Sequence, residues 1–152
     1  MEKEKNAIGH QGILNAIPHR YPFLFVDGIL DHDDVNYIVG FKNVSFSEQY
    51  VYGCSPDKPR FPESLITECM AQVGAVLVLQ NPEHHGKIML FAAIDHLRFH
   101  RAVYPGEQLV SRVERMYIKG TLGKMKAMAH VDGELVAEGE FSYALAERKA
   151  LG

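Results

Sequence analysis

The chain has 152 residues, of which 47% are hydrophobic and 23% are charged, and this composition is typical of a compact soluble domain. Its 13 glycines and 7 prolines follow no repeating pattern, which excludes a collagen-like or low-complexity chain. A formal net charge of -3 leaves no overall positive field, so nucleic-acid binding is disfavoured. No linker and no fixed-period repeat divides the chain, and we therefore expect one domain over residues 1–152.

The sequence predicts a cytoplasmic protein. The first twelve residues, MEKEKNAIGHQG, contain no apolar run of the kind found in a secretory signal. The longest apolar stretch, residues 73–79, is much shorter than the ~20 residues that cross a bilayer, so no membrane span is expected. Two cysteines, Cys54 and Cys69, are too few for a disulfide framework.

Two elements are expected before the middle of the chain. A short amphipathic helix is predicted over 10–16, and it ends before Pro18 because proline disfavours a helical conformation in the residue that precedes it. Residues 36–46 alternate between apolar and other side chains, which predicts a half-buried strand.

A longer helix is predicted over residues 62–80. Pro62 and Glu63 suit a first helical turn, and the apolar residues that follow occupy nearly every face. We therefore expect this helix to be buried on most of its sides.

The rest of the chain reads as strands. The dipeptide Asp132-Gly133 is a strong type I′ hairpin signal, because both positions of that turn need a positive φ. One long helix and a run of strands predict an α+β domain in which an antiparallel sheet wraps a central helix. Five strands and one helix make a small core, so an oligomer is expected, with sheet edges or helix faces paired across chains. The last four predicted strands cover 88–99, 108–118, 124–131 and 134–145.

Glu68 is anomalous because it lies in a helix that is otherwise almost uncharged. A buried carboxylate without a partner is strongly unfavourable, so something must compensate for it. A structural hydrogen bond or a basic neighbour is one interpretation. The other is a carboxyl with a raised pKa, which acts as a general acid or base at neutral pH.

The segment before the helix, residues 52–62, contains Pro56, Pro59 and Pro62 and leads to the helix N-terminus, where free N–H groups stabilise negative charge. It also contains Cys54, although an isolated cysteine is more often a small buried hydrophobe than a nucleophile. No metal site is expected, because the adjacent His84 and His85 diverge in most backbones and no Cys-x-x-Cys or His-x-x-x-His occurs.

Four blocks of the chain resemble one known family. Residues 18–27, PHRYPFLFVD, are similar to the opening signature of the FabZ-type (3R)-hydroxyacyl-[acyl-carrier-protein] dehydratases. The loop and helix over 53–72, the strand and turn over 94–109, and the hairpin over 131–138 follow in the family's order and spacing. The resemblance covers almost the whole chain beyond the first dozen residues.

This resemblance implies a hotdog fold, a long helix wrapped by a curved antiparallel sheet, and no cofactor. It implies homodimers with each active site built from two chains, often assembled as trimers of dimers. The implied reaction removes water from a 3-hydroxyacyl thioester on acyl carrier protein, in fatty-acid or related polyketide synthesis.

The resemblance also assigns roles to residues. In the family, a histidine in a Gly-His-Phe-Pro motif takes the α-proton, and a glutamate on the facing chain's helix helps to expel the hydroxyl. Glu68 matches the glutamate, whereas Cys54 stands in place of the histidine, after Gly53. Pro62 matches the start of the family's helix, and Glu63 replaces the glycine whose amide faces the thioester carbonyl.

The acyl chain of the family's substrate lies in an apolar tunnel at the dimer interface. The short basic cluster over 98–101 is either a solvated strand end or a docking site for an acidic carrier, through Arg98 and Arg101. The residues expected to line the tunnel are Ile66, Met70, Leu90, Phe91 and Phe99.

Three accounts of Cys54 remain open. Its thiolate acts as the base, although a thiol of pKa about 8.5 is mostly protonated at neutral pH. Alternatively, Glu68 moves the proton alone, with slow turnover. In the third account the protein binds acyl thioesters without dehydrating them, or is the inactive partner of a competent subunit. A hotdog thioesterase is disfavoured, because the proline-rich loop and Met70-Ala71-Gln72 resemble the dehydratase branch.

Overall fold

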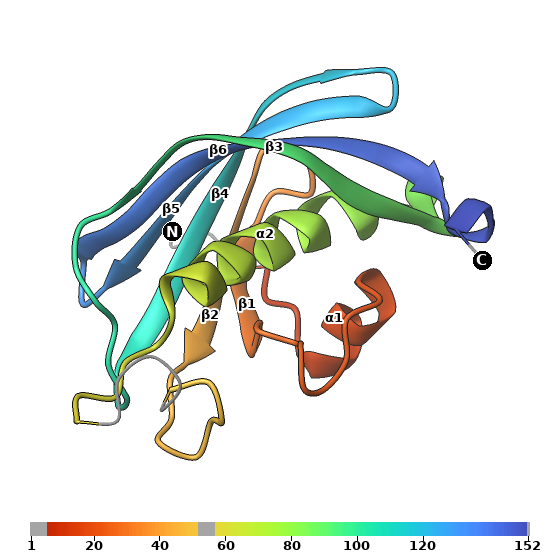
Figure 1. Ribbon diagram of the computed structural model, residues 1–152. Helices are drawn as coiled ribbons and strands as arrows, with labels where there is room; N and C mark the ends of the chain where they lie inside the picture. The colour runs from red at the N-terminus through yellow and green to blue at the C-terminus, as the bar shows by residue number, and fades with distance from the viewer. Residues whose placement is uncertain (1–5, 52–56, 152) are drawn as a thin grey trace, which may run out of the picture.

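The computed structural model describes residues 6–51 and 57–151, apart from the side chains of the last two of these. One antiparallel sheet curves over the long helix α2 (Glu63–Leu79), and the short helix α1 (His10–Ala16) lies beside that helix (Figure 1). This arrangement confirms the predicted α+β class and the hotdog fold. The sheet has six strands in the order β1-β2-β4-β5-β6-β3, namely β1 (Gly28–His32), β2 (Tyr37–Asn43), β3 (Lys87–Phe99), β4 (Gln108–Lys119), β5 (Leu122–Val131) and β6 (Glu134–Glu147).

Helix α2 is the centre of the core. From Leu65 to Leu79 all but two of its residues are buried, as the even distribution of apolar residues predicts. Gly74 lets the helix approach the sheet closely, because a Cβ at this position would collide with the sulfur of Met125 on β5. Within the described residues, no helix is long and apolar enough to cross a membrane.

The predicted elements agree with the structure except for one strand. Asp132 and Gly133 have φ values of 50° and 80°, as the hairpin signal requires. Strand β1 was not predicted. It has only five residues, and a register irregularity between Ile29 and Asp31 removes the alternation on which strand prediction depends.

Strand β3 forms one edge of the sheet and pairs only with β6. Its 13 residues include five large apolar side chains that are 36–43% exposed in the single chain. A long apolar edge of this kind is a template for pairing with another chain. These side chains are Leu90, Phe91, Ile94, Leu97 and Phe99.

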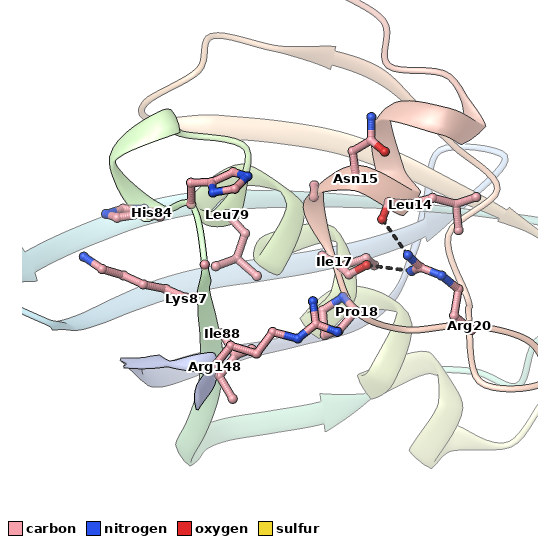
Figure 2. Close-up of a pocket in the computed structure, with 13 residues that line it drawn as sticks. Leu14, Asn15, Ile17, Pro18, Arg20, Leu79, His84, Lys87, Ile88 and Arg148 are labelled. Atoms are coloured by element: carbon pink, nitrogen blue, oxygen red, sulfur yellow. Dashed lines mark hydrogen bonds between the residues drawn. The ribbon is translucent and has the colours of Figure 1, made fainter. Parts of the chain in front are cut away.

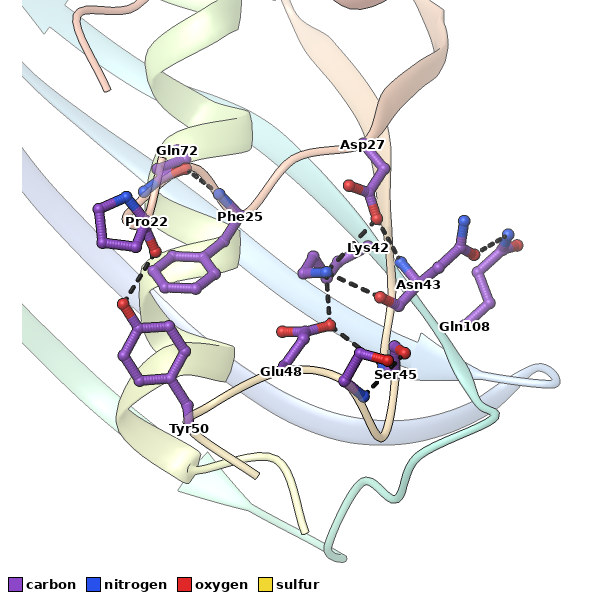
Figure 3. Close-up of polar contacts among 11 residues, drawn as sticks. Pro22, Phe25, Asp27, Lys42, Asn43, Ser45, Glu48, Tyr50, Gln72 and Gln108 are labelled. Carbon is purple, nitrogen blue, oxygen red and sulfur yellow. Dashed lines mark hydrogen bonds and ion pairs between the residues drawn. The ribbon is translucent and has the colours of Figure 1, made fainter. Parts of the chain in front are cut away.

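A buried lysine fastens the turn that leads toward the proline-rich segment. Lys42 lies on the core side of β2, and its Nζ donates to Oε1 of Glu48 at 2.8 Å and to the carbonyl of Asn43 at 2.7 Å (Figure 3). Nζ is also 3.6 Å from Oδ2 of Asp27. The hydroxyl of Tyr50 donates to the carbonyl of Pro22 at 2.8 Å. These contacts hold residues 45–51 against both β2 and the segment that precedes β1.

Candidate active site

Glu68 is not isolated, and it is less buried than the helix pattern suggests. Its side chain is 28% exposed, because it faces a cavity and not the sheet. Its Oε1 accepts a hydrogen bond from Nε2 of Gln72 at 2.8 Å and lies 3.5 Å from Nε2 of His19. Both the compensating hydrogen bond and a basic neighbour are therefore present.

Gln72 fixes the position of this carboxylate. Its residue is 1% exposed, and its Oε1 accepts from the backbone N–H of Phe25 at 2.8 Å (Figure 3). Its Nε2 donates to the carbonyl of Phe23 at 2.8 Å as well as to Glu68. One side chain thus ties the segment after the cis Tyr21-Pro22 bond to helix α2 and orients the carboxylate one helical turn away.

The cavity beside Glu68 has a volume of about 150 Å³. One part of its wall carries polar side chains and the rest is apolar, an arrangement that suits an acyl group with a polar reacting end. The lining residues are Pro18, His19, Glu68, Ala71, Gln72, Ala75, Leu79, Met89 and Phe91.

His19 is the functional candidate that the sequence analysis missed. Its side chain is 31% exposed, but its Nδ1 is buried and has no hydrogen-bond partner. Partial burial lowers the pKa of His19 below 6.5, and Arg20 acts in the same direction, while the carboxylate of Glu68 opposes them. The imidazole is therefore mainly neutral at pH 7.

Comparison with proteins of known family identifies the family of this chain. Residues 17–140 match the model of the FabA-like domain family. The chain is 46% identical over 139 residues to the 3-hydroxyacyl-[acyl-carrier-protein] dehydratase FabZ of Bacillus cereus strain AH820, covering 91% of this chain and 96% of that protein. The chain belongs to the FabZ dehydratase family.

Solved structures of similar fold have very different sequences. One is the dehydratase heterocomplex ApeI:P of Xenorhabdus doucetiae, with a TM-score of 0.77 and 14% identity over 91% of this chain and 93% of that one. A hypothetical thioesterase with coenzyme A from Streptococcus pneumoniae has a TM-score of 0.62 and 14% identity, over 91% and 94% of the two chains. Dehydratases and thioesterases share the hotdog fold, so these likenesses establish the fold alone.

Several of the residues assigned through the FabZ resemblance lie around α2. Pro62 caps the N-terminus of the helix, and Glu63, in its first turn, is 3.4 Å from the guanidinium of Arg60. Ile66 and Met70 are fully buried in the core of the single chain. Gly53 and Cys54 lie outside the described residues.

The predicted tunnel residues on β3 are divided between two surroundings. Phe91 lines the Glu68 cavity and contacts Phe141 edge to face, with ring centroids 5.6 Å apart. Leu90 and Phe99 are exposed on the same edge strand and do not line this cavity.

The two predicted carrier-binding arginines differ in their surroundings. Arg101 forms ion pairs with Glu107 at 3.1 Å and with Glu134 at 3.0 Å. Arg98 is exposed on β3, opposite Glu138, and the carboxylate of Glu138 is engaged by His100 at 3.1 Å. The charge of Arg98 is thus the more accessible of the two.

A second cavity, of about 170 Å³, lies between the end of α1 and the start of β3 (Figure 2). Among its lining residues are Arg20, Lys87 and Arg148, and none is acidic. The guanidinium of Arg20 donates to the carbonyls of Leu14 at 2.9 Å and Ile17 at 2.8 Å. This cavity adjoins the Glu68 cavity, with which it shares Pro18 and Leu79, and it is a second basic surface besides Arg98 and Arg101.

In the part of the chain that the structure describes, no three His, Cys, Asp or Glu side chains are grouped as metal ligands.

Proposed function

We propose that the protein, acting as one hotdog domain in the cytoplasm, removes water from a (3R)-hydroxyacyl thioester on acyl carrier protein, in fatty-acid or related polyketide synthesis. The observation that carries the proposal is Glu68, at the family's spacing, held by Gln72 in the wall of a cavity whose other walls are largely apolar. The 46% identity to a FabZ dehydratase supports it independently.

The reaction needs a base for the proton on C2 and an acid for the hydroxyl on C3. Glu68 supplies the acid, because its carboxyl faces the cavity. In this proposal the thioester binds near the start of helix α2, at Pro62 and Glu63. Gly53 and Cys54, which the resemblance assigns to the site, lie outside the described residues. The acyl chain lies against Phe91, and the exposed Leu90 and Phe99 complete its tunnel when two chains associate. Ile66 and Met70, which are fully buried in the single chain, support the tunnel from the core and do not line it.

The test is an enoyl-absorbance assay with 3-hydroxybutyryl and longer hydroxyacyl carriers. Wild type turns over, and Glu68→Gln loses about 10²- to 10⁴-fold in kcat, the usual effect of removing a general acid or base. Glu83→Gln, an exposed carboxylate outside the cavity, is the matched control and keeps full activity. A silent wild type beside an active Cys54→His variant would reject the dehydratase and leave an acyl-thioester binding protein or an inactive partner subunit.

We also propose a homodimer that forms through β3, with the active sites at its interface and trimers of dimers as the larger assembly. The support is the exposed apolar edge of β3. Ile94→Lys should give monomers in sedimentation velocity. Leu122→Lys, which replaces an equally large exposed side chain away from β3, should keep the dimer. Dimers of unchanged stability in Ile94→Lys would place the interface elsewhere.

The carrier, in this proposal, docks on Arg98, with Arg101 beside it. Arg98→Glu should weaken carrier binding and reduce its dependence on salt, because an exposed charge acts on an acidic partner over about 10 Å at 0.1 M ionic strength. Arg101→Glu should have a smaller effect on binding, because its charge is already paired with two carboxylates. Arg148→Glu is the matched control on the second cavity, and a larger loss there would move the docking surface to that side.

A further inference from the structure

The proposed reaction leaves one role without a suitable group. A proton must leave C2, and the thiol of Cys54 is mostly protonated at neutral pH at its ordinary pKa of about 8.5. The inference that follows rests on the proposed function and concerns the source of that base.

We propose that His19 and Glu68 together form the acid–base pair of the dehydration, with His19 as the proton acceptor. Both side chains line the same cavity, so a hydroxyacyl group that fills the cavity touches both. The Nε2 of His19 is 3.5 Å from Oε1 of Glu68, just beyond the 2.7–3.2 Å of a hydrogen bond. The hydrogen bond from Gln72 holds that same oxygen in place.

A second feature that bears on the role of His19 is its buried nitrogen Nδ1, which has no hydrogen-bond partner. A buried polar atom without a hydrogen bond is unfavourable by about 1–3 kcal/mol, and such atoms are uncommon in folded proteins. Nδ1 of His19 is one of them. Because Nδ1 is buried, a substrate in the cavity meets the ring at Nε2, beside Glu68. With the ring proton on Nδ1, the lone pair of Nε2 is free to act as the base.

Burial, and not the neighbouring charges, favours the neutral ring of His19. Glu68 faces it from α2, and Arg20 is its neighbour in the same segment. The β3 side of the cavity contributes Met89 and Phe91, which carry no charge. Burial and Arg20 outweigh Glu68, so the pKa of His19 is lowered and the imidazole can accept a proton at neutral pH.

The protons balance over the cycle. The C2–H bond breaks and its proton moves to the imidazole of His19, while its electron pair forms the C2–C3 double bond. The C3–O bond breaks, and the hydroxyl leaves as water with a proton from the carboxyl of Glu68. The imidazolium supplies that proton to the Glu68 carboxylate before the hydroxyl leaves, across the 3.5 Å between Nε2 and Oε1. A neutral imidazole and a carboxylate, the starting states, are thus regained without any co-reactant.

The experiment compares His19→Gln with His85→Gln, an exposed histidine outside the Glu68 cavity. His19→Gln should lower kcat by about 10²- to 10⁴-fold with KM unchanged, and should remove the decline of kcat/KM at acid pH that protonation of His19 causes. His85→Gln should keep the wild-type rate and pH profile. Equal thermal midpoints for the two variants would show that folding does not explain the difference.

A second measurement does not depend on turnover. In an NMR titration the pKa of His19 should be lower in Glu68→Gln than in wild type, because the carboxylate that raises it is gone. An identical pKa in both proteins would overturn the pair. An active wild type with an equally active His19→Gln would also reject the pair alone, whereas an inactive wild type would reject the proposed function itself.

Discussion

Replacing Gln72 with methionine should destabilise the protein more than any other polar substitution on α2. Methionine keeps the length and approximate volume of the side chain but cannot replace the amide. The N–H of Phe25 would then be a buried donor without an acceptor, and the carbonyl of Phe23 would lose its donor. Glu68 would lose the amide that orients it.

The magnitude follows from these contacts. An unsatisfied buried donor is unfavourable by about 1–3 kcal/mol, and a lost hydrogen bond at the partly buried Phe23 carbonyl by about 0.5–1.5 kcal/mol. We therefore expect the free energy of unfolding to fall by about 2–4 kcal/mol.

The assay is urea unfolding at one fixed protein concentration, because association raises apparent stability by mass action. Gln80→Met is the matched control. The Nε2 of Gln80 is already buried without a partner, so its removal should be neutral or stabilising. A loss below about 0.5 kcal/mol in Gln72→Met, within the range of ordinary surface changes, would refute the reasoning.

Three further predictions concern other parts of the molecule. Gly74→Ala should lower the free energy of unfolding by about 1–3 kcal/mol, because the new methyl group collides with Met125. In a double-mutant cycle, Met125→Ala should relieve this collision, so the double variant should be more stable than the sum of the two single effects. Additive effects would contradict the collision. Burial raises the pKa of Glu107, but hydrogen bonds from Arg101 and from the backbone N–H of Tyr104 outweigh it and hold this pKa below 4.5. The Glu107 carboxylate therefore stabilises the fold above pH 4.5. This stabilisation is lost as the pH falls through the lowered pKa. Glu107→Gln should therefore be less stable than wild type near neutral pH and should lose less stability below pH 4.5 in thermal melts, and parallel curves would count against the pairing. Burial raises the pKa of Cys69, so iodoacetamide should not alkylate it in the native protein. After unfolding, mass spectrometry should find it alkylated. Labelling of the native protein would show that helix α2 is more accessible than described.

The predicted elements were those with a strong local signal. Helix α2 is apolar on nearly every face, and the strands β3 to β6 are long, so their existence follows from pattern alone. Strand β1 is short and irregular, and only its pairing with β2 makes it a strand. Local pattern could not supply that pairing.

The same distinction applies to the site. Glu68 was found because a charge is conspicuous in an apolar helix. His19 was missed because it approaches Glu68 only through the packing of the segment after α1 onto α2, which Gln72 secures. One signal was available: Gln72 is a second polar residue four positions after Glu68, hence on the same helical face, and a buried amide there requires partners from another segment.

The exposed edge of β3 bears on which chains assemble together. Backbone N–H and C=O groups on an edge strand can pair with any extended partner, so they favour association but do not select the partner. Discrimination between a second copy of this chain and a related chain of the same fold therefore depends on side chains such as Phe91, Ile94 and Leu97. In a cell that holds two such chains, substitutions at these positions would change which chains pair while the fold stayed the same. A change of partner would also change the set of side chains that meet at each site.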